Sequence, residues 1–161
     1  MIPEAENGRA AEGQPDDGLR DAAAAVLPSP SMDVPCPLCS VADGREILAA
    51  NTYAVAIWDA FPVSPGHALV ISRRHVADLF ELSADEQAAL WALLPAVKAA
   101  LDARHLPAAY NVGVNVGAAA GQTVGHVHVH VIPRYEGDAA DPRGGVRWVL
   151  PDLADYWKPN R

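Results

Sequence analysis

The amino-acid sequence predicts an α+β domain built on an antiparallel sheet, and two features of its hydrophobic pattern carry this prediction. Runs of apolar, β-branched and aromatic residues typical of strands occur five times. They cover residues 46–50, 52–58, 67–72, 110–117 and 125–132. One long pattern of helical periodicity lies between the third and fourth runs. The order strand, strand, strand, helix, strand, strand favours a helix packed on an antiparallel sheet.

The strand predictions rest on local residue choice. Asn51 separates the first two runs, and the second of these is rich in β-branched and aromatic side chains. Residues 61–66 form a turn-rich loop with two prolines and a glycine. The run 67–72 alternates only loosely, so we expect a strand buried on much of both faces. The run 125–132 is the clearest strand, and we expect Pro133 to end it.

The helix prediction has a defined start. Ser83 and Glu86 have the spacing of a capping box, in which each side chain bonds the backbone N–H of the other residue. The apolar residues that follow share one helical face: Leu90, Leu94, Val97 and Leu101. We expect the helix to reach about Arg104, with a kink rather than a break at Pro95.

The N-terminal segment differs in composition from the predicted domain. Residues 1–34 are rich in Gly, Pro, Asp, Glu and Ala, and such a segment buries too little apolar surface to offset its ordering entropy. We therefore expect an N-terminal extension that is disordered, with translation from Met32 as an alternative. The short apolar run 22–27 follows acidic residues, so we expect no signal peptide and a cytoplasmic location.

Charge and hydropathy exclude some classes of partner. No apolar run approaches the roughly 20 residues that a membrane helix requires. The net charge is −8, which argues against non-specific binding to nucleic acid or to a membrane surface. A small anionic substrate is compatible with this charge, because it requires only a local group of hydrogen-bond donors.

Three alternating histidines form the most informative motif. Side chains alternate between the faces of a strand, so His126, His128 and His130 are expected on one face, with the intervening valines directed to the core. Histidines spaced in this way suit either a zinc site or a nucleophilic centre, and the spacing alone leaves both open.

The two cysteines, Cys36 and Cys39, form a Cys-Pro-Leu-Cys motif. In a reducing compartment such a pair favours half of a metal site or a redox pair over a structural disulfide.

The residues around the histidines resemble the histidine-triad (HIT) family, whose signature alternates three histidines with apolar residues. The resemblance runs from Cys36 to Arg134. It comprises the block from Asp59 through Pro65-Gly66-His67 to Ile71, the block from Tyr110 to Asn115, and the segment Ala120-Gly-Gln-Thr-Val124 before the triad, with Pro133-Arg134 after it.

The resemblance implies a fold and an assembly. The HIT-like domain would cover residues 35–135, with a five-stranded antiparallel half-barrel sheet and one long helix. Two copies would pair as a homodimer with a continuous ten-stranded sheet. Residues 143–151 resemble the C-terminal segment of bacterial members of the dinucleoside polyphosphate hydrolase type, so the tail 136–161 would contribute to the substrate site or the dimer. Arg134 and Arg147 are candidates for binding distal phosphates.

The resemblance also implies the chemistry. His128 would be the nucleophile that takes up a nucleotidyl group, since an imidazole nitrogen is nucleophilic at neutral pH. His130 would contact the phosphate or the leaving oxygen as a protonated donor. The remaining nucleotide-binding candidates are His67, Asn115, Gln122 and Thr123 near the phosphate, Asp59 at the ribose, and Ile57 and Phe61 at the base; for these last two, a place in the core is an equally good interpretation.

A structural Zn²⁺ is the only cofactor that the resemblance implies, and no organic cofactor is expected. Its ligands would be Cys36, Cys39, His75 and His126, a sulfur and nitrogen set that suits closed tetrahedral zinc. His105 matches no position of the family, and we expect it at the C-terminus of the helix, where it is favourable beside the helix dipole.

These features predict a nucleotide hydrolase. It would cleave at the α-phosphate of a dinucleoside polyphosphate or nucleoside phosphoramidate, with an adenine nucleotide favoured. The alternatives are a diadenosine tetraphosphate phosphorylase or nucleotidyltransferase, a zinc-dependent hydrolase that uses the triad as ligands, and a nucleotide-binding interaction module without turnover.

Overall fold

The computed structural model describes residues 36–40 and 44–157. The prediction of disorder for residues 1–34 and the alternative start at Met32 lie outside this range. The sheet consists of strands β1 (Ile47–Ala50), β2 (Ala54–Trp58), β3 (Ala68–Ser72), β4 (Ala109–Gly113) and β5 (His128–Arg134). The helices are α1 (Ala84–Ala92), α2 (Leu94–His105) and the short α3 (Pro151–Ala154), with 3₁₀ turns η1 (Leu79–Glu81), η2 (Ala118–Ala120) and η3 (Gly145–Val149).

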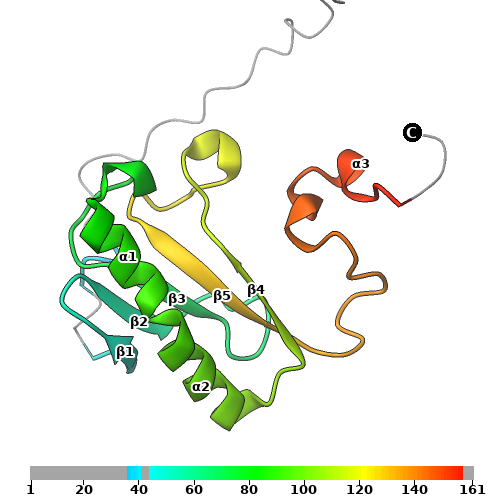
Figure 1. Cartoon of the computed structure of the whole chain (residues 1–161), viewed down its shortest axis with the longest axis horizontal. Helices are drawn as coiled ribbons and strands as arrows, with labels where there is room; N and C mark the ends of the chain where they lie inside the picture. Colours follow the sequence, from blue (N-terminus) through cyan, green and yellow to red (C-terminus); the bar gives the residue numbers. More distant parts are fainter. Residues whose placement is uncertain (1–35, 41–43, 158–161) are drawn as a thin grey trace, which may run out of the picture.

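All five strands pair antiparallel in the order β1-β2-β3-β5-β4. The last strand in sequence therefore lies between β3 and β4, with α1 and α2 along one face of the sheet (Figure 1). This architecture confirms the predicted α+β class, the antiparallel sheet and the helical layer. No described helix has the length and apolar character that crossing a membrane requires.

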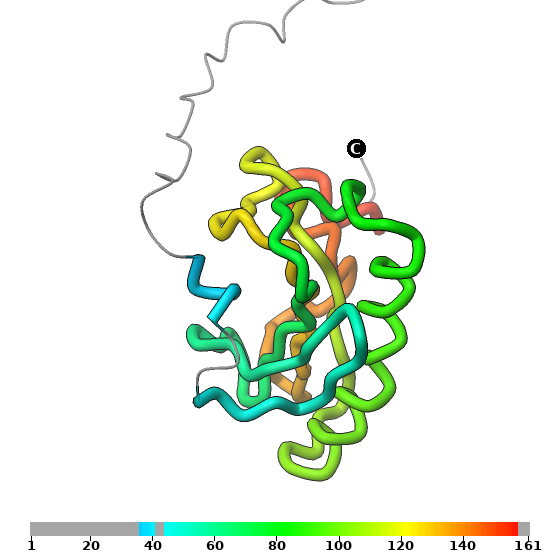
Figure 2. Tube along the Cα trace, turned by 90° about the vertical axis from the view of Figure 1, so that its left-hand side faces the viewer, coloured from blue at the N-terminus to red at the C-terminus, as the bar shows by residue number. Residues whose placement is uncertain are grey.

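The two faces of the sheet pack against different partners. On the face toward the helices, every second residue of β2, β3 and β5 packs against the helical layer. The buried residues of that layer are Leu90, Leu93, Val97 and Leu101. The intervening residues Val55, Ile57, Leu69 and Ile71 form a second apolar cluster with Leu38 on the other face. The tube view shows the helices on one side of the sheet and the 36–40 segment on the other (Figure 2). The core valines of β5 lie on the helix side, as predicted.

The helical layer begins as expected and is then interrupted. Ser83 and Glu86 form the complete capping box. The long helix is assigned as α1 and α2, which meet at Leu93. Leu93 keeps an αR backbone, directs its N–H to Leu90 and Trp91, and accepts the N–H of Val97, so the chain stays helical near Pro95, as predicted. Pro95 has no N–H with which to serve the Trp91 carbonyl, so the regular pattern fails one turn before the proline. Leu93, rather than the predicted Leu94, is the buried leucine.

The bounds of β4 and β5 correct the prediction. β5 begins at His128 instead of Gly125, because the N–H of Val127 bonds Val76 in the loop after β3. β5 also continues through Pro133. The Pro133 carbonyl accepts from the Ser64 hydroxyl, so the missing N–H faces the loop before β3, whose first residue, Ala68, pairs with Val131. No ladder bond is lost there. β4 ends at Gly113, short of the predicted residue 117.

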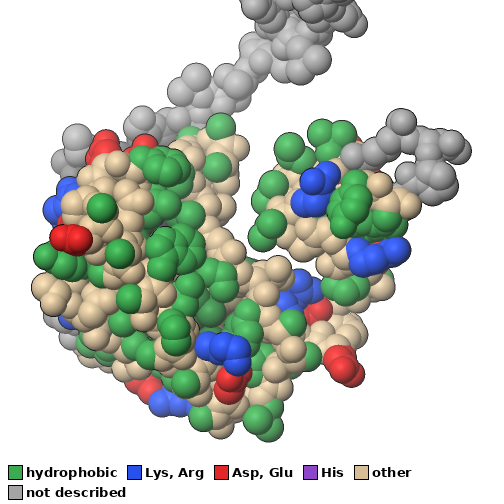
Figure 3. Space-filling view, viewed as in Figure 1, with side chains coloured by type: hydrophobic (Ala, Val, Ile, Leu, Met, Phe, Trp, Pro, Cys, Tyr) green, Lys and Arg blue, Asp and Glu red, His purple; other side chains and the backbone are tan. Residues whose placement is uncertain are grey.

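The C-terminal segment, residues 139–157, stands beside the sheet (Figure 1). It has its own small packing unit, in which Gly144 approaches Trp157 and the Arg143 guanidinium lies 4.6 Å from the Trp157 ring centroid. Figure 3 shows hydrophobic side chains over its surface. The exposed apolar residues are Val146, Trp148, Val149, Leu150, Leu153 and Tyr156.

Candidate functional site

His128 and His130 lie on the sheet face opposite the helices, where they pair with Ile71 and Leu69 of β3. Their ring centroids are 5.0 Å apart. The Nδ1 of His128 lies 2.7 Å from the His126 carbonyl oxygen. A carbonyl only accepts, so Nδ1 carries the proton and Nε2 carries a free lone pair. This tautomer makes Nε2 of His128 the available nucleophilic nitrogen.

His130 continues into a buried chain of polar groups. His67 Nε2 lies 3.1 Å from His130 Nδ1, and Asp59 Oδ2 lies 3.2 Å from His67 Nδ1. The Val63 N–H points at the same Nδ1 from 3.3 Å. Neutral His67 accepts from Val63 and donates through Nε2 to His130, which leaves the Nε2–H of His130 free to donate to a ligand. Protonated His67 would pair with Asp59.

Burial and the neighbouring rings favour neutral His130. Burial lowers its pKa to about 4, with smaller contributions from His128 and His67, while Asp59 opposes the shift. Burial also lowers the pKa of His67 against the attraction of Asp59. These shifts favour a neutral His130 at pH 7 when no nucleotide is bound, and the protonated donor expected from the sequence stays a prediction for the nucleotide-bound state.

Lowering the pH from 6.5 to 4.5 is expected to reduce the free energy of unfolding. Unfolded His130 takes up a proton near its ordinary pKa of 6.5, whereas the folded protein resists this until about 4. The unfolded state therefore binds more protons within this window, and stability falls with pH. Glu86, with a pKa lowered from 4.5 to about 2, contributes to the loss chiefly below it.

Urea denaturation of the wild type and of His130→Gln at pH 7 and pH 5 checks this prediction. The variant should lose less stability between the two pH values than the wild type. Equal losses in both proteins would show that His130 does not carry the effect.

A second cluster lies at the start of the triad. Cys36, Cys39, His75 and His126 bring ligand atoms within 4.8 Å of one another. Cys39 Sγ lies 3.2 Å from His75 Nδ1 and 3.6 Å from His126 Nδ1. Cys36 Sγ lies 3.5 Å from His126 Nδ1, and the two Nδ1 atoms are 3.3 Å apart. The structure thus brings together all four residues that the sequence predicted as metal ligands.

These distances fit a four-coordinate cation. Tetrahedral zinc with ordinary bond lengths separates sulfur and nitrogen ligands by about 3.6 Å and two nitrogen ligands by about 3.3 Å. The Nε2–H of His126 donates to the Ser72 carbonyl at 2.7 Å, which leaves Nδ1 as the lone-pair atom directed into the cluster. Asp59, His67 and His130 also lie within 4.8 Å of one another, but His67 there turns a different nitrogen to each partner, which suits a hydrogen-bonded chain better than a shared ion.

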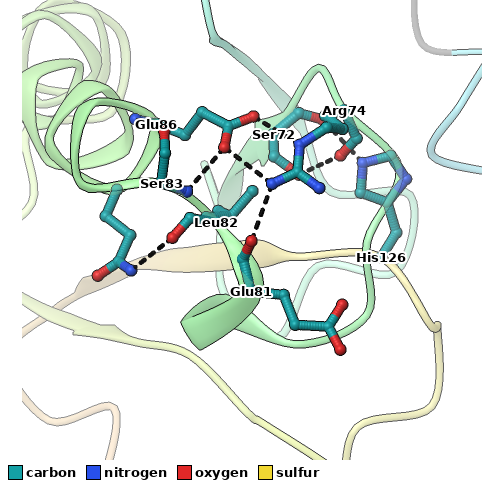
Figure 4. Close-up of polar contacts among 8 residues, drawn as sticks. Ser72, Arg74, Glu81, Leu82, Ser83, Glu86 and His126 are labelled. Carbon is teal, nitrogen blue, oxygen red and sulfur yellow. Dashed lines mark hydrogen bonds and ion pairs between the residues drawn. The ribbon is translucent and has the colours of Figure 1, made fainter.

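A polar network fixes the loop that carries His75 and the carbonyl that orients His126 (Figure 4). The Ser72 hydroxyl donates to the Arg74 carbonyl. The Arg74 guanidinium bonds both carboxylate oxygens of Glu86 at 2.7 and 2.8 Å and also donates to the Glu81 carbonyl. Since Glu86 belongs to the capping box, the metal-binding candidates are tied to the N-terminus of α1. No sequence pattern signals this role of Arg74.

The other predicted nucleotide-binding residues take different positions. Asn115 follows β4 by two residues, and Thr123 is exposed; within the described residues, neither side chain makes a hydrogen bond. Gln122 accepts from Gly117 and donates to Ala77 and Val124, so its amide ties the loop before the triad instead of facing the histidines. Ile57 is fully buried, which favours its core interpretation, whereas Phe61 is largely exposed.

Asp59 lies beside a pocket at the end of β2, and the residues that line it are Arg45, Glu46, Trp58, Asp59 and Ala60. The two arginines expected at distal phosphates are engaged elsewhere. Arg134 bonds Asp138 and Asn111, and Arg147 donates to carbonyls of Leu153 and Ala154. These partners fix the orientation of each guanidinium, and the N–H groups that the printed bonds leave over are the ones a phosphate could reach without exchange.

The comparisons with known proteins agree with this geometry. Residues 44–137 match the family model of the HIT domain. A bifunctional bis(5'-adenosyl)-triphosphatase/adenylylsulfatase of Arabidopsis thaliana is 38% identical over 96 residues, covering 60% of this chain and 53% of the relative. An AP-4-A phosphorylase of Mycobacterium tuberculosis is 35% identical, covering 58% of this chain and 48% of the relative. The chain thus spans about half the length of these two enzymes.

Solved structures share the fold. A HIT family protein from Bacillus anthracis superposes with a TM-score of 0.58 at 34% identity, covering 62% of this chain and 73% of that chain. A Zn-bound histidine triad family protein from Mycobacterium smegmatis gives a TM-score of 0.57 at 29% identity, covering 74% of this chain and 91% of that chain.

Proposed function

The chain belongs to the HIT domain family, and from this we propose that it is a nucleotide hydrolase that cleaves at the α-phosphate of a dinucleoside polyphosphate or nucleoside phosphoramidate. One observation carries the proposal: the His126 carbonyl holds the Nδ1–H of His128, so that Nε2 is a free nucleophile beside the Nε2–H of His130. Relatives that hydrolyse or phosphorolyse dinucleoside polyphosphates support the substrate class.

The proposed reaction has two steps. His128 Nε2 attacks the α-phosphorus, the bond from that phosphorus to the leaving oxygen or nitrogen breaks, and the leaving group takes up a proton from solvent as it departs. A water molecule then attacks the same phosphorus and gives its proton to solvent, the N–P bond breaks, and a nucleoside monophosphate is released while Nε2 regains its lone pair. The nucleotidyl ring is cationic in between, and its Nδ1–H bond to the His126 carbonyl strengthens as that charge develops.

The nucleotide would contact several of the predicted residues. Asp59 would accept from the ribose hydroxyls beside the pocket at the end of β2, with the exposed ring of Phe61 against the base. His67 and His130 would hold the phosphate, together with Asn115 and Thr123. Ile57 would form the floor beneath the base, and Gln122 would act through the loop that it ties.

The Cys36, Cys39, His75 and His126 cluster would hold structural Zn²⁺, and the reaction as proposed needs no organic cofactor. Four protein ligands close the coordination sphere, so no position remains for water or substrate. This argues against the alternative in which the triad supports a zinc-dependent hydrolase. When bound, the ion would supply cross-linking between the 36–40 segment and the start of β5.

We further propose the assembly expected from the sequence: a cytoplasmic homodimer of HIT domains 35–135, with the tail 136–161 completing the substrate site or the dimer. β4 is an edge strand of the described sheet, and an unpaired edge is open to pairing with a second copy. The exposed apolar surface of residues 146–156 is typical of a segment that contacts another surface.

Product analysis tests the activity and separates its alternatives. The purified protein is incubated with diadenosine tetraphosphate or adenosine phosphoramidate, with and without inorganic phosphate, and the nucleotides are separated by chromatography. We expect AMP as a product without phosphate. Phosphate-dependent release of ADP would favour the phosphorylase, in line with the M. tuberculosis relative. Nucleotide binding without turnover of any of these substrates would favour the interaction module.

A further inference from the structure

His105, the last residue of α2, lies against two segments of the candidate site. Its ring packs edge-on against Trp58, with centroids 5.5 Å apart and planes at 76°. On its other side it approaches Gly66 so closely that a Cβ there would lie 2.8 Å from its Cδ2. Gly66 also has a φ of +82°, so this position requires glycine both for the backbone and for the contact.

Each of the two residues that His105 contacts comes directly before a residue of the candidate site in the sequence. Trp58 precedes Asp59, and Gly66 precedes His67. The Asp59 N–H donates to the His67 carbonyl at 3.0 Å, which closes the loop between them. From His67 the chain of contacts continues to His130. The His105 ring therefore contacts the residues at both ends of the loop between Asp59 and His67.

A set of polar contacts around Trp58 fixes the surroundings of His105. The Trp58 Nε1–H donates to Glu46 at 3.0 Å, and Glu46 pairs with Arg104. The Arg104 guanidinium lies 5.4 Å from the Trp58 ring centroid. Since Glu46 precedes β1 and Arg104 belongs to α2, these contacts join the sheet edge to the helix end and limit movement of the His105 ring.

We propose that His105 is a positioning residue, which holds Asp59 and His67 in register with His130 through the contact of its ring with Trp58 and Gly66. The inference rests on the proposed nucleotide hydrolysis and assigns a role to a residue outside the triad pattern. The contact acts through the shape of the ring, since the atoms that approach Gly66 most closely are the ring carbons Cδ2 and Cγ.

Two substitutions separate ring shape from histidine chemistry. His105→Ala removes the ring and should lower kcat/KM by about 10-fold to 100-fold, the range that small displacements of a catalytic group produce. His105→Phe keeps a planar ring of similar size and should stay within about threefold of the wild type. Lys98→Gln, on the exposed side of α2, is the matched control and should leave kcat/KM unchanged.

A readout independent of turnover accompanies the kinetics. Titration of the imidazole nitrogens by NMR should show the pKa of His67 moving up toward 6.5 in His105→Ala, because a loosened loop admits water, whereas His105→Phe should resemble the wild type. Asp59 and His130 face His67, and their interactions are part of the measured value. AMP affinity should fall in His105→Ala in parallel.

The Gly66 contact is tested by a double-mutant cycle. Gly66→Ala should impair AMP binding, and adding His105→Ala should restore part of the loss by removing the clash. The proposal is overturned if His105→Ala leaves kcat/KM, AMP affinity and the His67 titration unchanged, or if His105→Phe is as impaired as His105→Ala. If the wild type turns over no nucleotide, the proposed function fails, while the NMR titration still decides the positioning role.

Discussion

His128→Ala is expected to lower the turnover of diadenosine tetraphosphate by about 10⁴-fold or more, as removal of a covalent nucleophile does in other enzymes. Nucleotide binding should persist, because the ribose and phosphate contacts that we propose come from other residues. Within the described site, His128 is the histidine whose proton is held by a backbone carbonyl and whose second nitrogen is left free. His130 and His67 turn nitrogens toward each other instead.

The measurement combines steady-state kinetics with trapping of the covalent intermediate. Substrate labelled at the α-phosphorus should leave label on the wild-type protein after rapid denaturation at alkaline pH, and none on His128→Ala. Lys98→Gln, which keeps the whole triad and lies on the exposed side of α2, is a control that should be labelled like the wild type. Undiminished turnover in His128→Ala would exclude the proposed mechanism.

Cys39→Ser is expected to abolish stoichiometric zinc binding and to lower the free energy of unfolding by about 3 kcal/mol or more, since structural zinc contributes directly to folding. For a chain of this size that corresponds to a fall in Tm of about 6–12 °C. Elemental analysis and thermal unfolding of the protein with and without added zinc measure both effects. The activity that remains below the lower Tm should exceed that of His128→Ala, because zinc lies outside the proposed chemistry.

Arg74→Gln is expected to weaken zinc binding only partly, in contrast to its loss in Cys39→Ser. It keeps all four candidate ligands but removes the ion pair with Glu86, and loss of such outer contacts typically weakens metal affinity by about 10-fold to 100-fold. Competition with a chromogenic chelator measures the affinity. Arg73→Gln, at the neighbouring exposed position, is the matched control and should bind zinc like the wild type. Zinc retained at full affinity in Cys39→Ser would contradict the assigned site.

The sequence was sufficient for the parts of the molecule that depend on local pattern. Runs of apolar, β-branched and aromatic residues identified the five strands, and Ser83 with Glu86 identified the helix start, because both features depend on neighbours close in the chain. Strand ends were less predictable. Pro133 stays within β5 because β3, whose first residue pairs with Val131, does not extend beside it, and that information lies in a different part of the sequence.

The histidine pattern by itself placed the three rings on one strand and left metal binding and nucleophilic chemistry equally open. Tertiary contacts distinguish the rings. His126 gives its Nε2–H to Ser72 and turns Nδ1 to the cysteines, whereas His128 gives its Nδ1–H to a carbonyl and keeps Nε2 free. The proton on an imidazole is placed by its hydrogen-bond partner, and these partners come from distant or irregular backbone.

Sequence alone thus determined the fold class, the family resemblance and the set of chemically capable residues. The tertiary structure decided which nitrogen each histidine exposes, directed Gln122 into its loop, and brought Arg74 and His105 against the site segments. These last roles depend on contacts between α1 or α2 and loops distant in sequence. A local pattern cannot encode them, because packing sets the neighbours of a side chain only after the chain has folded.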